Sequence, residues 1–317
     1  MREIVFLRKY SDKWKEFEEV LKKPKSTHPD KLAELYIDLT NDLAFAQSNY
    51  PNTQTTEYLN QLSLRVHDTL YKNKKEDRKR IITFWTKEIP EVYARNQKAV
   101  LYSFIVFAIA FCVGYLSASQ DPTFLRLILG DAYVNMTVSN IENNDPLAVY
   151  KQERSVEMFL RITLNNVRVS FIAFVFGLIT SIGTGFILFQ NGIMLGAFLQ
   201  FFSSYSLLEK SLLVVFIHGT LEISAIVLAG AAGIAFGNSF LFPGTYSRGR
   251  AFINGARTGL KMVVGLVPIF IIAGALESFV TRYTEMPIWL SLCIIFGSLT
   301  FILYYFIILP NKIRLTE

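Results

Sequence analysis

The stretch that decides the fold of this 317-residue chain is residues 211–236, SLLVVFIHGTLEISAIVLAGAAGIAF. A helix needs about 20 mainly apolar residues to cross a hydrocarbon core about 30 Å thick. This stretch exceeds that length, and its only charged or titratable side chains are those of His218 and Glu222. It therefore predicts a transmembrane helix.

Further apolar windows lie on both sides of this stretch, and none precedes residue 99. They predict six spans, at about 99–118, 168–189, 192–208, 211–236, 259–280 and 288–308. We therefore expect an all-α protein, in which a polytopic membrane helix bundle (residues 99–317) follows a cytoplasmic helical domain (residues 1–98). The last part of that domain, IITFWTKEIPEVYARNQ (81–97), predicts a juxtamembrane amphipathic segment.

Charge predicts the orientation. Nineteen of the 32 Lys and Arg residues precede Ala99, and the connection 237–258 carries Arg248, Arg250 and Arg257 without an acid. Basic residues favour the cytoplasmic side, so we expect both termini inside and the segment 119–167 outside the inner membrane. If residues 192–208 did not cross the membrane, the connection 237–258 and its three arginines would lie outside, against this charge rule. Basic flanks explain the net charge of +6, and no nucleic-acid partner is expected.

Ionisable residues inside a span are costly and face a bundle interior, a partner or water. His218 and Glu222 are four residues apart, so they project from one helix face. We predict an intramembrane polar cluster formed by His218, Gly219, Glu222, Glu277, Gln200, Asn165, Asn166 and Arg168. A His218–Glu222 hydrogen bond that holds helices together is the structural alternative to a site.

Small residues at four-residue spacing allow helix backbones to approach closely. The predicted packing positions are Gly192, Gly196, Gly233, Gly237, Gly255 and Gly259. They serve either packing within the bundle or a homodimer face.

The N-terminal domain shows helical periodicity over about 30–50 and 55–72. We expect a polar network between these two helices, made by Asp38, Asp42, Asn60, Arg65 and His67.

Several motifs along residues 30–305 resemble one family. They are D-L-A-x-A (42–46), Tyr50–Pro51, Y-L-N-x-L (58–62), R-x-H-x-x-L-Y (65–71), Asn165–Asn166, G-T-G (183–185), Asn191–Gly192 with Gly196, and H-G-x-x-E (218–222). The pattern is similar to that of the stage II sporulation protein M family, and H-G-x-x-E within a span is its most specific part. The resemblance implies a membrane platform for peptidoglycan-remodelling enzymes, although most relatives belong to bacteria and archaea that never sporulate.

Three functions follow from these observations. The first is a non-enzymatic envelope protein that scaffolds or regulates peptidoglycan-remodelling machinery, with the bilayer, other envelope proteins and a second copy of itself as partners. The second is a transporter or channel that uses His218, Glu222 and Glu277. The third is an intramembrane metal-dependent hydrolase, for which H-G-x-x-E offers two ligands where catalytic zinc usually takes three. The third ligand would have to be Glu277 or an asparagine.

We expect no catalytic residue, no metal and no cofactor. A water-accessible cavity that reaches His218 would favour transport, whereas a dry, fully paired His218–Glu222 would favour scaffolding.

Overall fold

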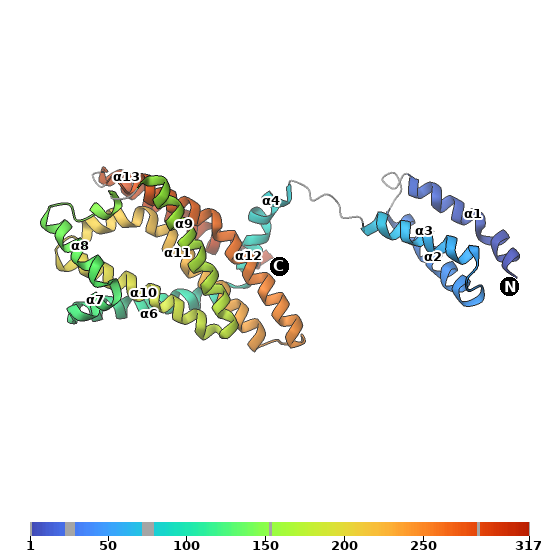
Figure 1. The fold of residues 1–317 in the computed structure, drawn as a ribbon, viewed down its shortest axis with the longest axis horizontal. Coiled ribbons are helices and arrows are strands. Elements are labelled where there is room, and N and C mark those ends of the chain that lie inside the picture. Colours follow the sequence, from blue (N-terminus) through green and yellow to red (C-terminus); the bar gives the residue numbers. More distant parts are fainter. Residues whose placement is uncertain (1, 23–28, 72–78, 152–153, 284–285, 317) are drawn as a thin grey trace. The chain divides into compact units, whose positions relative to one another are not determined.

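The computed structural model describes residues 2–22, 29–71, 79–151, 154–283 and 286–316, and all their regular elements are helices. The chain forms two compact units, Met1–Arg80 and Ile81–Glu317 (Figure 1). The predicted all-α class is therefore confirmed.

The first unit packs three helices, α1 (Glu3–Lys22), α2 (Pro29–Asn49) and α3 (Gln54–Tyr71). Each helix places its apolar stripe against the other two, as an amphipathic surface helix does. The buried core consists of Phe6, Trp14, Phe17, Leu39, Ala46, Leu59 and Leu62. Three of these residues lie on α1, a helix that the sequence reading did not identify.

That missing helix also corrects the predicted polar network. Three of its members pair with side chains of α1: Asp38 with Lys13 (2.5 Å), Asp42 with Trp14 Nε1 (2.9 Å) and Arg65 with Glu18 (3.6 Å). Asn60 is exposed, and the side chain of His67 lies outside the described part of the chain. These contacts tie α2 and α3 to α1, whereas the sequence predicted a network between α2 and α3 alone.

In the described part of the second unit, six helices are long and apolar enough to cross a membrane. They are α6 (Gln97–Gln120), α9 with the 3-10 turn η4 (Ser155–Val175, Phe176–Ile179), α10 (Ser181–Ser204), α11 (Leu208–Leu241), α12 with the π-helical turn η5 (Arg248–Ala275, Leu276–Val280), and α13 with η6 and α14 (Ile288–Leu303, Tyr304–Ile308, Leu309–Thr316). The six-span prediction is confirmed.

The bounds of the second and third spans were wrong. The helix predicted at 168–189 is interrupted at Thr180, whose φ of 93° ends η4 and starts α10. The turn expected at Gln190–Asn191 lies inside α10, so the span predicted at 192–208 is the second half of a longer helix. No charge or proline marks Thr180, and the small and polar residues that follow it, S-I-G-T-G (181–185), were taken as part of one span.

The same shift shortens the segment predicted outside the membrane at 119–167, because α9 already begins at Ser155. What remains between α6 and α9 includes α7 (Pro122–Leu129), α8 (Asp131–Glu142) and the 3-10 turn η3 (Ala148–Lys151). Leu125, Val134 and Leu147 are buried in one apolar cluster with Phe201 and Phe202 of α10. These short helices therefore cover one end of the bundle.

The amphipathic segment 81–97 belongs to the membrane unit. It forms α4 (Lys79–Thr83), the π-helical turn η2 (Phe84–Glu88) and α5 (Ile89–Arg95), which lead into α6. Glu88 pairs with Lys261 of α12 at 2.6 Å, and Gln97 Nε2 donates to the Phe306 carbonyl at 2.9 Å. The boundary between the units therefore lies at 80/81 and not at 98/99.

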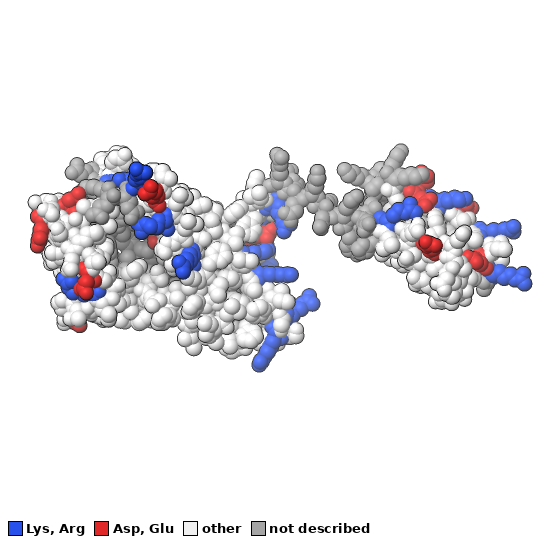
Figure 2. Space-filling view, in the orientation of Figure 1, with Lys and Arg blue, Asp and Glu red and all other residues white. Residues whose placement is uncertain are grey.

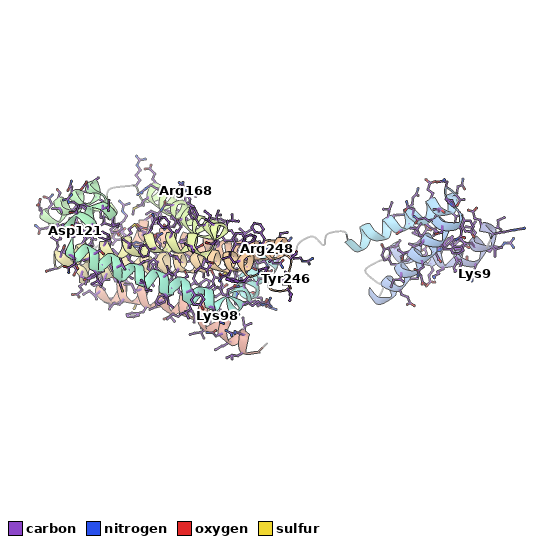
Figure 3. The ribbon with its side chains drawn as sticks, turned by 90° about the horizontal axis from the view of Figure 1, so that it is seen from below. Lys9, Lys98, Asp121, Arg168, Tyr246 and Arg248 are labelled. Atoms are coloured by element: carbon purple, nitrogen blue, oxygen red, sulfur yellow. The ribbon has the colours of Figure 1, made fainter. Side chains whose placement is uncertain are left out.

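Basic residues gather at the end of the membrane unit that holds the α11–α12 connection (Figure 2). The connection is short, residues 242–247, so Arg248, Arg250 and Arg257 lie on α12 and not in the predicted loop 237–258. Asp121, at the start of α7, lies at the opposite end of this unit from Arg248 (Figure 3).

The six predicted packing glycines all face neighbours within the chain. Gly192 and Gly196 face α6, Gly233 and Gly237 face α9, η4 and α10, and Gly255 and Gly259 face α11 and α9. A Cβ at Gly192 would lie 2.7 Å from Ala110 Cβ. These contacts therefore serve packing within the bundle, which is one of the two uses predicted for the six glycines.

We predict that Gly196→Ala destabilises the membrane unit by about 1–3 kcal/mol, because overpacking a tight contact has that cost. The new Cβ would lie 2.6 Å from the backbone nitrogen of Tyr115, which cannot rotate away. Gly297→Ala is the matched control, since no atom lies within 4 Å of a Cβ there. Thermal unfolding in detergent should show a lower Tm for the first variant only; equal Tm values would contradict the packing described.

Candidate functional site

Three ionisable side chains meet inside the membrane unit. His218 and Glu222 project from α11, and Glu277 projects from η5. One possible ligand atom from each of the three lies within 4.8 Å of those of the other two. His218 Nε2 and Glu277 Oε2 are 3.8 Å apart, and both side chains are largely buried. The cluster thus joins two spans that are distant in sequence.

The π-helical turn η5 brings the second side of the cluster into place. It begins directly after α12, and π turns inside helices occur frequently at functional sites. Thr281 follows the turn and is fully buried; its Oγ1 lies 3.1 Å from His218 Nδ1. The same hydroxyl lies 3.2 Å from the Leu276 carbonyl, to which it donates. His218 therefore contacts Thr281 through one ring nitrogen and faces Glu277 with the other.

Two cavities border the cluster. One, which we call the apolar chamber, has a volume of about 380 Å³ and is lined mainly by apolar side chains of α6, α7, α10 and α11, among them Phe107, Ile128, Leu195 and Ile226. The other, the polar pocket, has a volume of about 530 Å³ and is lined by Arg161, Ile162, Asn165, Asn166, His218, Glu222 and Glu277. Both cavities share Asn165, Asn166, His218 and Glu222, so they meet at the cluster.

One buried polar atom in the wall of both cavities, Asn166 Nδ2 on α9, has no hydrogen-bond partner among the described residues. Two other buried atoms without such a partner, Thr163 Oγ1 on α9 and Ser278 Oγ on η5, line neither cavity. Asn166 interacts with the carboxyl group of Glu222, but not with the geometry of a hydrogen bond from Nδ2. Buried polar groups are normally satisfied by protein or by ordered water. The unpartnered amide of Asn166 therefore indicates that a polar occupant belongs in the pocket.

Tyr150 of η3 closes the cluster from the end covered by α7 and α8. Its ring lies 5.9 Å from the ring of His218 in an edge-on arrangement. Burial raises the pKa of the Tyr150 phenol well above its usual value, and the charges of Glu277, Tyr133 and Glu222 raise it further. The phenol therefore stays protonated at neutral pH and lines the apolar chamber as a hydrogen-bond donor.

The structure brings together six of the eight residues predicted for the polar cluster: Asn165, Asn166, His218, Gly219, Glu222 and Glu277 line the two cavities. Gln200 and Arg168 line neither of them. Arg168 points away on the exposed side of α9 (Figure 3). Gln200 was included for its apparent depth, which the misplaced bounds of the third span had shifted. Arg168 was included because it was expected at the outer mouth of the second span.

Sequence reasoning missed Arg161, Tyr150 and Thr281. Two of them had a signal in the helical spacing, because Arg161 precedes Asn165 by four residues and Thr281 follows Glu277 by four. The contact of Tyr150 with His218 depends on tertiary packing alone. In place of the predicted His218–Glu222 hydrogen bond, the partners of His218 are Thr281 and Glu277.

The arrangement suits a bound cation. Two carboxylates and one imidazole face a common space, with Arg161 at the edge of the polar pocket as the cationic neighbour of Glu277. Gly219 lines the apolar chamber, and a Cβ there would meet only Ile223 and Val215 of its own helix, at 3.6 and 3.8 Å. The absent side chain therefore leaves room beside the cluster.

Comparison with known proteins identifies relatives of both units. A family model described as stage II sporulation protein M matches residues 103–282, which include the cluster. A domain of unknown function (DUF8413) matches residues 4–72. An uncharacterised protein of Methanocaldococcus jannaschii is 25% identical over 201 residues, which cover 62% of this chain and 88% of that protein. No solved structure matches the chain.

We predict that the polar pocket admits water-soluble reagents. In a background without Cys112 and Cys293, Asn165→Cys should react with a cationic methanethiosulfonate in intact proteoliposomes, since Asn165 lines both cavities. Ala229→Cys, at a fully buried position on α11, should react only after unfolding. Equal protection of the two cysteines would show that the pocket is closed to water.

Proposed function

The chain belongs to the stage II sporulation protein M family, and we propose that this member is a transporter or channel that takes a small cation into the cavities around His218. The observation that carries the proposal is the meeting of two cavities at an intramembrane cluster of two carboxylates and an imidazole. Ionisable residues inside spans commonly mark the paths of ions and protons.

The depth of the apolar chamber supports a path into the membrane. Phe107 lies near the middle of α6, and Asn191 lies near the middle of α10. The chamber also extends to Ile128 and Tyr133 in the short helices that cover the bundle end. A solute that enters between these short helices would therefore reach the middle of the spans.

In the other half of the bundle α11 is tightly packed. From Ala225 to Gly237 the side chains of α11 are almost all buried, mainly small residues such as Ala229, Ala231 and Gly233. Transporters bind their substrates near the bilayer midplane and open to one side at a time. We therefore infer a state open toward α7 and α8 and closed toward Arg248.

A second function is supported by the first unit. It has a core of its own and a separate family model, so it could dock partner proteins as the platform role of the family requires. The two functions are compatible, because a docked partner could control a membrane cavity. The cavities favour transport as the activity of the membrane unit.

The orientation that we propose places both termini in the cytoplasm of a cell with an inner membrane, because the basic end of the bundle then faces inward. In the cysteine-free background, Arg250→Cys should react with an impermeant maleimide only in inside-out vesicles. Asp131→Cys, at the start of α8, should react only in right-side-out vesicles. Labelling of Arg250→Cys from the outside would reverse the topology.

Transport itself can be tested in proteoliposomes that contain dyes for H⁺, Na⁺, K⁺, Mn²⁺ or Zn²⁺. The wild-type protein should raise the flux of at least one of these cations about tenfold or more over protein-free liposomes. Gly219→Leu should return that flux to background, because its side chain would project into the apolar chamber beside His218 and obstruct it. Gly297→Leu, which has open space around it, should behave as wild type.

Thermal unfolding of Gly219→Leu would confirm that the variant is folded before its flux is interpreted. Wild-type flux equal to that of protein-free liposomes for all five cations, or full flux in folded Gly219→Leu, would reject the transport proposal.

A further inference from the structure

We propose that His218, Glu222 and Glu277 bind a divalent transition-metal ion of the Zn²⁺ or Mn²⁺ type where the two cavities meet. This inference rests on the proposed function, since the ion would be the transported cation. It reverses the sequence-based expectation of no metal. H-G-x-x-E supplies two ligands, and the structure adds the third from η5.

The ligand atoms are already close to coordination geometry. Ligands about 2.0–2.2 Å from a tetrahedral ion lie about 3.3 Å from one another. The three atoms here lie within 4.8 Å, and His218 Nε2 is 3.8 Å from Glu277 Oε2. Rotation of the two glutamate side chains is enough to close the remaining distance, and the adjoining cavities leave room for it.

The hydrogen bond between His218 and Thr281 orients the imidazole ring for a metal. The Thr281 hydroxyl has one proton, which it directs to the Leu276 carbonyl. Its oxygen then accepts from His218 Nδ1–H, so Nε2 presents a lone pair toward Glu277. In metal-binding histidines, the ring nitrogen that does not bind the metal almost always donates its N–H to a neighbouring acceptor. This hydrogen bond fixes the tautomer and the orientation of the ring.

The mixed ligand set selects the class of ion. Imidazole suits zinc, copper, iron and nickel, whereas carboxylates suit magnesium, calcium and manganese. One imidazole with two carboxylates therefore favours borderline ions over alkali metals. The unpartnered Asn166 Nδ2, 96% buried in the wall of both cavities, is placed to donate to a water on the ion.

Metal binding can be measured on the tag-free full chain in lipid nanodiscs. Equilibrium dialysis against Zn²⁺ and Mn²⁺ should show one bound ion per chain, and this binding should require the cluster. Bound Co²⁺ should show the visible absorption bands of an ion with nitrogen and oxygen ligands. His218→Ala, Glu222→Gln and Glu277→Gln should each weaken binding about 100-fold or more. Glu209→Gln, an exposed carboxylate in the first turn of the same helix, should bind as wild type.

Thr281→Val tests the positioning role separately. Loss of such an outer partner typically lowers metal affinity about 10- to 100-fold. The ligands remain, so Co²⁺ should still bind but with shifted absorption bands. An unchanged spectrum and affinity would show that Thr281 does not orient His218.

Folded wild-type protein that binds no Zn²⁺ or Mn²⁺ would overturn the inference, and so would full binding in any folded ligand variant. Three ligand positions are tested independently, so a variant that fails to fold does not remove the test. Flux of Na⁺, K⁺ or H⁺ that Gly219→Leu blocks, without metal binding, would reject the metal and keep the transport proposal. Metal binding without any cation flux would keep the site and reject transport.

Discussion

Hydrocarbon offers no hydrogen-bond partner, so every polar group on a helix inside a membrane must find one within the protein or in a hydrated cavity. This constraint acts most strongly on α11, which packs against α6, α9, α10, α12 and α13. In one half of α11 the side chains are mostly small and apolar, so they need no hydrogen-bond partner and allow close packing. The other half carries His218 and Glu222, and the surrounding helices must supply partners and space for them.

The partners come from elements that depart from regular helix. The π-helical turn η5 places Glu277 beside His218, and Thr281, which follows it, meets the other ring nitrogen. The 3-10 turn η3 brings Tyr150 onto the same ring. Two cavities adjoin a cluster built in this way, and Asn166 Nδ2, in the wall of both, has no hydrogen-bond partner among the described residues. That is why the geometry favours a binding site over a contact that only holds helices together.

The sequence predicted what depends on composition and helical spacing. Apolar windows gave six spans, and the four-residue spacing placed His218 and Glu222 on one face. The break at Thr180 was missed because neither charge nor proline marks it, and the small and polar run S-I-G-T-G (181–185) was placed inside a span. The error displaced the predicted bounds of the second and third spans and, with them, the apparent depth of Gln200. The approach of η5 to α11 depends on tertiary packing, which no local pattern reports.

The central claim is that α11 presents its ionisable residues to water inside the bundle. Water-edited solid-state NMR of ¹⁵N-histidine protein in bilayers tests it most directly, because His218 can be assigned from its loss in His218→Ala. The account predicts that magnetisation from water reaches the His218 ring as quickly as it reaches exposed side chains. Build-up as slow as that of side chains in the packed half of α11 would show a dry cluster and contradict the account.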